Sequence, residues 1–305
     1  MSSPIFMSST MSRYSTIVVT KPHGLRFALG TAICALVALA MLVVAAHAQE
    51  REPDRAAPLS TAAPMPAPVE TSSPACRAPT VLTRLDLPLR HSARRLASGE
   101  PLTIVAIGSS STAGAGASSP AATYPSRLAV ELHARFPGHD IAVVNRGING
   151  EETEQMVARF RTAVFAEHPQ LVLWQVGTNS VLRDRPLRPH SLELHEGIDE
   201  LKGTGSDVVL IDPQYAPRVI AKPETPNMVE QIGLTAKEEN VALFHRFALM
   251  RDWYETQHLP FDTFISPDGL HMNDWSYACM AKVLARAIAG AIEQPVAAAA
   301  VHLSR

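Results

Sequence analysis

Short apolar runs recur along this chain, and each is followed by a segment in which apolar residues return at helical spacing. The runs cover residues 103–108, 140–145, 171–176, 207–211 and 241–244, and the first three lead into turns that contain glycine. Apolar runs of this length are typical of buried strands, and strands that alternate with helices favour a parallel sheet covered on both faces. We therefore expect one three-layer α/β/α domain built on a mostly parallel five-stranded sheet.

The predicted helices are long enough to cover such a sheet. The last one shows the periodicity most clearly, with Met280, Leu284 and Ile288 four residues apart. We expect helices over residues 120–136, 151–165, 190–202, 225–239, 247–255 and 274–292.

A serine cluster and an acid–imidazole pair lie at opposite ends of this predicted domain. Residues 109–112 follow the first strand and read Ser-Ser-Ser-Thr, whereas Asp268 and His271 are three residues apart in a turn before the last helix. A serine hydroxyl becomes a nucleophile only beside a base, and the base needs a partner that orients it. The two segments would meet if the first strand is central and the last helix returns beside it.

Four short motifs, in this order, resemble the blocks of the SGNH (GDSL-like) esterase and lipase family. The serine cluster matches the Gly-Asp-Ser block with Ser110 at the nucleophile, Gly150 falls on the glycine block, and Asn179 falls on the Gly-x-Asn block. Asp268 and His271 match the Asp-x-x-His block. The resemblance implies a flavodoxin-like SGNH hydrolase fold.

The resemblance covers roughly residues 100–292 and departs from the family pattern near two motifs. Ser109 stands where the family has Asp, Thr178 where it has a second Gly, and Ser180 where it has Asp. None of these changes removes a catalytic atom. They indicate a divergent subfamily and weaken any transfer of substrate.

The resemblance assigns a role to each matched residue. Ser110 is the nucleophile, His271 the general base and then the acid, and Asp268 the group that orients the imidazole. The backbone N–H groups of Ser110 and Gly150 and the side-chain amide of Asn179 form the oxyanion hole. Taken one at a time, these residues also fit plainer structural roles: serines cap helices, and Gly, Asn and Asp are common in turns.

These roles predict a serine esterase. The habit of the family and the expected location outside the cytoplasm imply that it removes short acyl groups, acetyl above all, from a carbohydrate or another small ester. The alternatives are an O-acyltransferase with the same serine chemistry and a catalytically silent carbohydrate-binding domain of the cell envelope. We expect no cofactor and no metal, because His-Glu-x-x-His is absent and His190 and His195 are five apart. The net charge of −2, without a basic stripe, argues against nucleic acid as a partner.

The N-terminal region has the pattern of an export signal. Basic residues precede an apolar run over residues 27–46, which ends at the small-residue motif Ala46-His47-Ala48. If uncut, the run is long enough to be a membrane tether. We expect a signal peptide or membrane anchor over 1–48, a Pro/Ala-rich disordered linker over 49–80, the hydrolase domain over 81–294 and a flexible tail over 295–305. The protein is thus expected to be exported, to the periplasm or beyond.

Two cysteines remain after this segment. Cys34 lies inside the apolar run, which leaves Cys76 and Cys279 in a compartment expected to be oxidising. We expect them to form a disulfide; the alternative is a pair of free thiols.

Other polar segments allow two readings each. Residues 212–217 follow the fourth strand and either shape the substrate pocket or form a rigid proline turn. Arg183, Asp184 and Arg185 either contact an anionic or sugar substrate or form a solvated loop.

Overall fold

The computed structural model of the protein describes residues 73–294. The predicted signal or anchor over 1–48, its tether at 27–46, most of the predicted linker and the tail over 295–305 lie outside this range. Between residues 73 and 294, no helix combines the length and the hydropathy that a membrane span requires.

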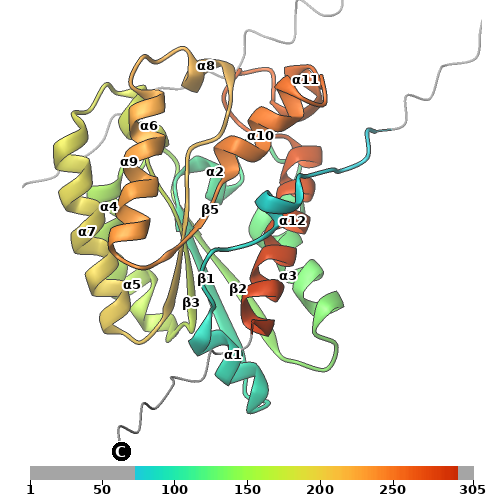
Figure 1. The fold of residues 1–305 in the computed structure, drawn as a ribbon, viewed down its shortest axis with the longest axis vertical. Helices are drawn as coiled ribbons and strands as arrows, with labels where there is room; N and C mark the ends of the chain where they lie inside the picture. Colours follow the sequence, from blue (N-terminus) through green and yellow to red (C-terminus); the bar gives the residue numbers. More distant parts are fainter. Residues whose placement is uncertain (1–72, 295–305) are drawn as a thin grey trace, which may run out of the picture. The chain divides into compact units, whose positions relative to one another are not determined.

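A five-stranded parallel sheet forms the centre of the described domain (Figure 1). Its strands lie in the order β2-β1-β3-β4-β5, and every neighbouring pair is parallel. The strands are β1 (Leu102–Gly108), β2 (Ile141–Gly147), β3 (Leu171–Gln175), β4 (Asp207–Ile211) and β5 (Ala242–Phe244). The predicted α/β/α fold is therefore confirmed, and all five predicted strands are present.

Helices cover both faces of the sheet, and the side they occupy changes around β1. Helices α3 (Tyr124–Arg135) and α12 (Asp274–Glu293) lie on one face, whereas α4 (Thr153–Val157), α5 (Phe160–Ala163), α7 (Leu187–Gly203) and α9 (Thr225–Glu238) lie on the other (Figure 1). From β1 the chain first adds β2 on one side of the sheet and then β3, β4 and β5 on the other, so the order of the strands reverses between β1 and β3. In sheets of this order, the crevice at the carboxyl ends of these two strands is where ligands bind.

Shorter elements connect the layers, and several of them were not predicted. Helix α1 (Arg90–Ala97) precedes β1, and α10 (Arg246–Glu255) follows β5. Single turns of helix are α2 (Ser110–Ala113), α6 (Thr178–Leu182), α8 (Pro217–Ile220) and α11 (Phe261–Phe264), with 3₁₀ turns η1 (Thr80–Thr83), η2 (Pro120–Ala122) and η3 (Phe165–Glu167). Segments this short lack the apolar repeat that reveals a helix in a sequence.

The helix predicted over 151–165 is interrupted in the structure. It divides into α4, α5 and η3, and the interruption falls at Arg159. The guanidinium of Arg159 reaches back to the Glu151 carboxylate and to the carbonyl of Arg146, 2.6 Å away. The side chain of Arg159 is thus bound to the preceding loop at the point where the helix is interrupted.

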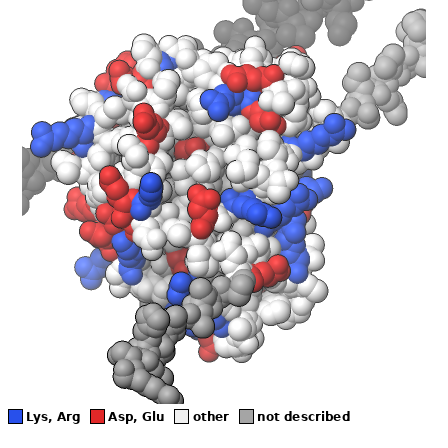
Figure 2. All heavy atoms as spheres, in the orientation of Figure 1, with Lys and Arg blue, Asp and Glu red and all other residues white. Residues whose placement is uncertain are grey.

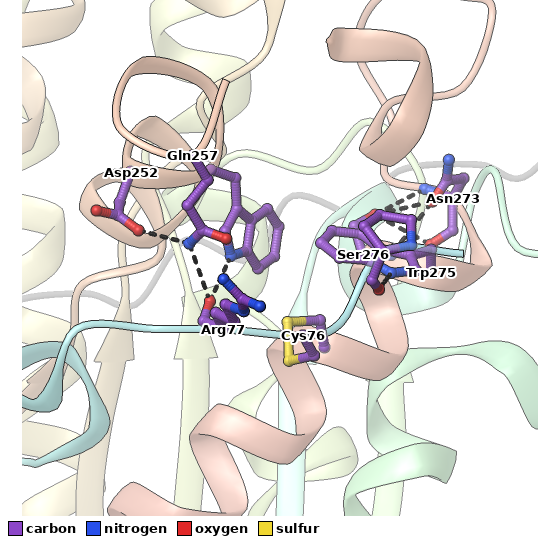
Figure 3. The surroundings of a disulfide bond; sticks show 10 residues. Cys76, Arg77, Asp252, Gln257, Asn273, Trp275 and Ser276 are labelled. Atoms are coloured by element: carbon purple, nitrogen blue, oxygen red, sulfur yellow. Dashed lines mark hydrogen bonds between the residues drawn. A yellow bond between two sulfur atoms is a disulfide. The ribbon is translucent and has the colours of Figure 1, made fainter. Parts of the chain in front are cut away.

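Residues 73–80, assigned above to the linker, pack onto the domain (Figure 3). The indole N–H of Trp275 donates to the carbonyl of Pro74 at 2.8 Å, and that of Trp253 donates to the carbonyl of Arg77 at 3.1 Å. Between these contacts Cys76 forms a disulfide with Cys279 of α12, with the two Cα atoms 5.3 Å apart. The predicted disulfide is present, and the packed part of the chain begins before residue 81.

Glycines end the two strands beside the serine cluster. Gly108 of β1 and Gly147 of β2 are paired in register. A Cβ at Gly147 would lie 2.1 Å from the backbone nitrogen of Ala113, so only glycine lets α2 sit against the end of β2. The side chain of Asn145 then anchors α2 by donating to the carbonyl of Thr112 at 2.9 Å.

Acidic and basic side chains share the molecular surface. Figure 2 shows Lys and Arg interspersed with Asp and Glu over the face that it draws. This face carries charges of both signs, as the small net charge of the chain would suggest.

We predict that Gly147→Ala destabilises the protein by about 3 kcal/mol, because the new methyl group overpacks against the backbone of α2. Gly290→Ala is the matched control: it lies in α12 with no atom within 4 Å of the added Cβ. Alanine favours helix there by up to about 1 kcal/mol. Urea denaturation measures both, and equal effects would contradict the close approach at Gly147.

We also predict that the Cys76–Cys279 disulfide forms in exported protein. Mass spectrometry of a non-reduced digest should find the two peptides linked. A bond between residues separated by 203 positions stabilises by about 5 kcal/mol in the chain-entropy model. The double variant Cys76→Ala/Cys279→Ala should therefore have a melting temperature close to that of the reduced wild type and well below that of the oxidised wild type. Two free thiols in protein purified without reductant would refute the bond.

Candidate active site

The serine cluster forms a tight turn in which two serines bind one side chain and the third, Ser110, contacts another. Ser109 and Ser111 are buried, and both hydroxyls donate to the side-chain oxygen of Gln175, at 2.9 and 3.0 Å. The backbone N–H of Ser109 donates to the same oxygen at 2.9 Å. Ser110 is also buried, at 8% exposed, but its Oγ points to the histidine turn and lies 2.8 Å from Nε2 of His271.

The chain folds back on itself around Asp268 and His271. An isolated antiparallel bridge joins Ile265 to Met272, and the N–H of Ser266 donates to the carbonyl of His271 at 2.7 Å. Gly269 takes a φ of +69° inside this turn. Asp268 and His271 are thereby brought face to face, with Oδ2 2.5 Å from Nδ1.

The surroundings of Asp268 favour its charged form. Partial burial acts to raise the pKa of this carboxyl, but hydrogen bonds from the backbone and ring of His271 and from the N–H of Leu270 outweigh burial and hold the pKa below its usual range. Both backbone N–H groups donate to Oδ1 at 2.9 Å. An ionised carboxylate only accepts hydrogen bonds, so Nδ1 of His271 carries a proton, and in the neutral imidazole Nε2 then presents a lone pair to Ser110.

The loop after α2 holds the serine turn against the histidine turn. A Cβ at Gly116, where φ is +86°, would lie 2.2 Å from the carbonyl oxygen of Met272. The N–H of Ser118 donates to the carboxylate of Asp274 at 2.7 Å, and the hydroxyl of Tyr277 donates to the carbonyl of Ala115 at 2.7 Å. The start of α12 is thus fastened to the loop that follows Ser110.

The loops after β2 and β3 bring Gly150 and Asn179 to the same edge of the sheet. Gly150 has a φ of +80°, and the amide nitrogen of Asn179 donates to the carbonyl of its neighbour Glu151 at 2.8 Å. Because β1 lies between β2 and β3, the residues after all three strands meet at one end of the sheet. The structure therefore brings the predicted oxyanion residues to the end of the sheet that carries Ser110.

Arg183 and its neighbours brace the loop that contains Gly150. Arg183 donates to the Gly150 carbonyl at 2.9 Å and to the Glu152 carboxylate at 2.7 Å. Arg185 lies 3.2 Å from Glu152, and Asp184 accepts from Lys222 at 2.6 Å. Arg183, Asp184 and Arg185 were expected either to contact substrate or to form a solvated loop. In the structure they join neighbouring surface loops to one another.

The segment over 212–217 lies between the loop after β3 and the histidine turn. A Cβ at Gly177 would be 3.2 Å from Pro213, and the side chain of Gln214 donates to the carbonyl of Leu270 at 3.4 Å. The N–H of Arg218 donates to the carbonyl of Gly269 at 3.0 Å. The segment thus supports the back of the histidine turn, and Asp212 and Gln214 are both buried.

Two buried polar residues beneath the serine turn were not singled out from the sequence. Gln175 is the single polar residue of β3, whose other residues are apolar, and that contrast was a usable signal. Arg246 begins α10 and is fully buried, with Nη1 2.8 Å from the Ser111 hydroxyl. A lone arginine at a helix start gives no sign of burial in a sequence.

No three His, Cys, Asp or Glu side chains in the described domain lie close enough together to hold a metal ion. The chemistry available at this site is that of a hydroxyl, an imidazole and a carboxylate in line, with backbone and amide N–H groups nearby.

Comparison with known proteins gives partial matches to esterases. The chain is 37% identical over 79 residues to an acetylxylan esterase of Geobacillus stearothermophilus and 32% identical over 85 residues to an arylesterase of Vibrio mimicus. These matches cover 26% and 27% of this chain and 36% and 42% of the relatives, well under the full length of either.

A solved structure shares the fold. It is a two-domain esterase active on acetylated mannans, which superimposes with a TM-score of 0.62 at 18% identity over 71% of this chain and 57% of the other. At this identity the likeness shows the fold alone, and it agrees with the flavodoxin-like arrangement described above.

The family itself is shown by a match over most of the described domain. Residues 75–294 match the model of the non-GDSL lipase-like family, beginning next to Cys76 where packing onto the domain begins. The family's description as non-GDSL agrees with the serine block of this chain, where Ser109 replaces the usual aspartate. The match confirms the predicted relation to divergent SGNH-like ester hydrolases. The chain belongs to the non-GDSL lipase-like family.

Proposed function

We propose that this protein is an exported, metal-independent serine esterase that removes acetyl or other short acyl groups from a carbohydrate or small ester. The observation that carries the proposal is the hydrogen-bonded series from Ser110 Oγ to His271 Nε2, at 2.8 Å, and from His271 Nδ1 to Asp268. The names of the relatives, which include an acetylxylan esterase and an arylesterase, support an acyl ester as substrate.

The proposed reaction begins with proton transfer from Ser110. Nε2 of His271 takes the hydroxyl proton while Oγ attacks the ester carbonyl, and Asp268 stabilises the imidazolium that forms. The imidazolium then protonates the departing alcohol, which leaves an acyl group on Ser110. Water, activated by the same imidazole, releases the acid and restores the enzyme.

The developing negative charge on the carbonyl oxygen requires N–H donors that are already in place. We assign this role to the backbone N–H groups of Ser110 and Gly150 and to the side chain of Asn179. The Asn179 amide carries two N–H groups, and one of them is used on the Glu151 carbonyl. The other is free to bind the oxyanion, and the Glu151 bond fixes its direction.

Export is the part of the proposal that rests on the N-terminal region and the cysteines. A disulfide such as Cys76–Cys279 persists in oxidising compartments and is rare in the cytosol. The pattern over residues 1–48 agrees with that location. Tagged protein should therefore be recovered from the periplasm or medium, in a shorter form if the segment is cleaved.

We predict that Ser110→Ala lowers kcat on p-nitrophenyl acetate by about 10⁴-fold or more and leaves the residual catalysis of the oxyanion hole. A serine-directed phosphonate should label Ser110 in the wild type. Ser98→Ala is the control, because Ser98 is an exposed serine of the α1 C-terminus and should behave as wild type. Labelling at Ser109 or Ser111 would show that the wrong serine is assigned.

The same assays, run in EDTA, test the absence of a metal. The wild-type rate should not change. Loss of activity in EDTA that zinc or manganese restores would refute the serine mechanism.

We predict that Asn179→Ala lowers kcat by about 10²–10³-fold with KM nearly unchanged, because its N–H binds charge that develops in the transition state. Asn227→Ala is the control. It removes an exposed amide of α9 that donates to the Glu224 carboxylate, and it should leave kcat and KM unchanged. A change confined to KM would instead make Asn179 a substrate-binding residue.

A further inference from the structure

A charged side chain lies beneath the serine turn without contacting the reacting atoms. Arg246 is fully buried; its Nε donates to the backbone carbonyl of Asp212 at 2.9 Å, and its Nη1 donates to the hydroxyl of Ser111 at 2.8 Å. The Asp212 carboxylate accepts from the N–H of Phe247 at 2.7 Å. Arginines are almost never fully buried unless they are paired, so this one requires an explanation.

Ordinary ion pairing does not explain Arg246. Its bonds go to a carbonyl and a hydroxyl, and within residues 73–294 its Nη2 and the Oδ2 of Asp212 have no hydrogen-bond partner. Burial lowers the pKa of Arg246 to about 10 and raises that of Asp212 to about 7, which reflects the cost of keeping both charged. Apolar side chains of similar volume would avoid this cost.

What Arg246 supplies is a fixed direction for the hydrogen bonds above it. A guanidinium can only donate, so the Ser111 hydroxyl must accept from Arg246 and use its own proton elsewhere. That proton goes to the side-chain oxygen of Gln175, 3.0 Å away. The same oxygen receives the N–H and hydroxyl of Ser109, so the amide of Gln175 is oriented with its oxygen toward the turn.

We propose that Arg246 is a positioning residue for the nucleophile: acting through Ser111 and Gln175, it fixes the turn that presents Ser110 to His271. The proposal rests on the role of Ser110 proposed above. Ser110 lies between the two residues whose hydroxyls Gln175 binds, so a shift in either would move its Oγ away from the 2.8 Å contact with His271. Displacements of about 1 Å in an active site can reduce rates about 10²-fold.

Ser111→Ala is the smallest change that breaks this connection. We expect kcat to fall about 10- to 100-fold, with KM within about 2-fold of wild type, and phosphonate labelling of Ser110 to slow in proportion.

The matched control is Ser92→Ala. Ser92 is also fully buried, and its hydroxyl donates to the carboxylate of Asp207 at 2.8 Å, at the opposite end of β4 from Asp212. This variant should lower the melting temperature comparably and leave kcat unchanged. If Ser111→Ala keeps the wild-type kcat, or if Ser92→Ala loses as much, the proposal is overturned.

Changes at Arg246 test the connection from its other end. Arg246→Lys keeps a donor and should retain more of kcat than Arg246→Met. When Ser111 is already alanine, Arg246→Lys should cause little further loss of kcat, because the hydrogen bond from Arg246 to the Ser111 hydroxyl is already absent. If instead the two substitutions lower kcat independently, so that their fold-losses multiply in the double variant, the proposal is overturned. Ser110→Ala, assayed in parallel, separates the two ideas: an active Ser110→Ala refutes the proposed function itself.

Discussion

The arrangement of the site depends on one buried acceptor, the side-chain oxygen of Gln175. It lies at the end of β3, next to β1, and receives three hydrogen bonds from the serine turn at 2.9–3.0 Å. Burying the Gln175 oxygen without these donors would cost free energy, and burying the serine donors without this acceptor would cost free energy too. This mutual requirement ties the start of α2 to the centre of the sheet and leaves the Ser110 hydroxyl facing His271.

The second half of the site is held by bonds within a few residues of chain. Asp268 is fixed by the N–H groups of Leu270 and His271, and these bonds also lower its pKa. A carboxyl whose pKa is lowered on folding adds stability above its unfolded pKa, and this stability is lost as the pH falls through the folded value. The histidine turn should therefore loosen in acid before the sheet does, because the sheet depends on apolar burial.

The sequence predicted the sheet and the matched motif residues, because both leave local patterns. Apolar runs identified all five strands, and the Asp-x-x-His spacing identified a turn whose bonds are local. The contribution of Arg246 was not predictable, since it contacts Ser111 across 135 positions and no local pattern marks it. The division of the helix at Arg159 was also missed: the bond of its side chain to the preceding loop is a contact that helical periodicity does not reveal.

The disulfide at Cys76 has a mechanical consequence. Chain that enters the domain is joined at this residue to Cys279, near the start of α12, ahead of η1, α1 and β1. Tension applied to the N-terminal side of the protein would pass through the sulfur atoms into a 20-residue helix packed on the sheet. That force would bypass η1, α1 and β1, and it would enter α12 close to Asp274 and Tyr277, which hold the loop after Ser110.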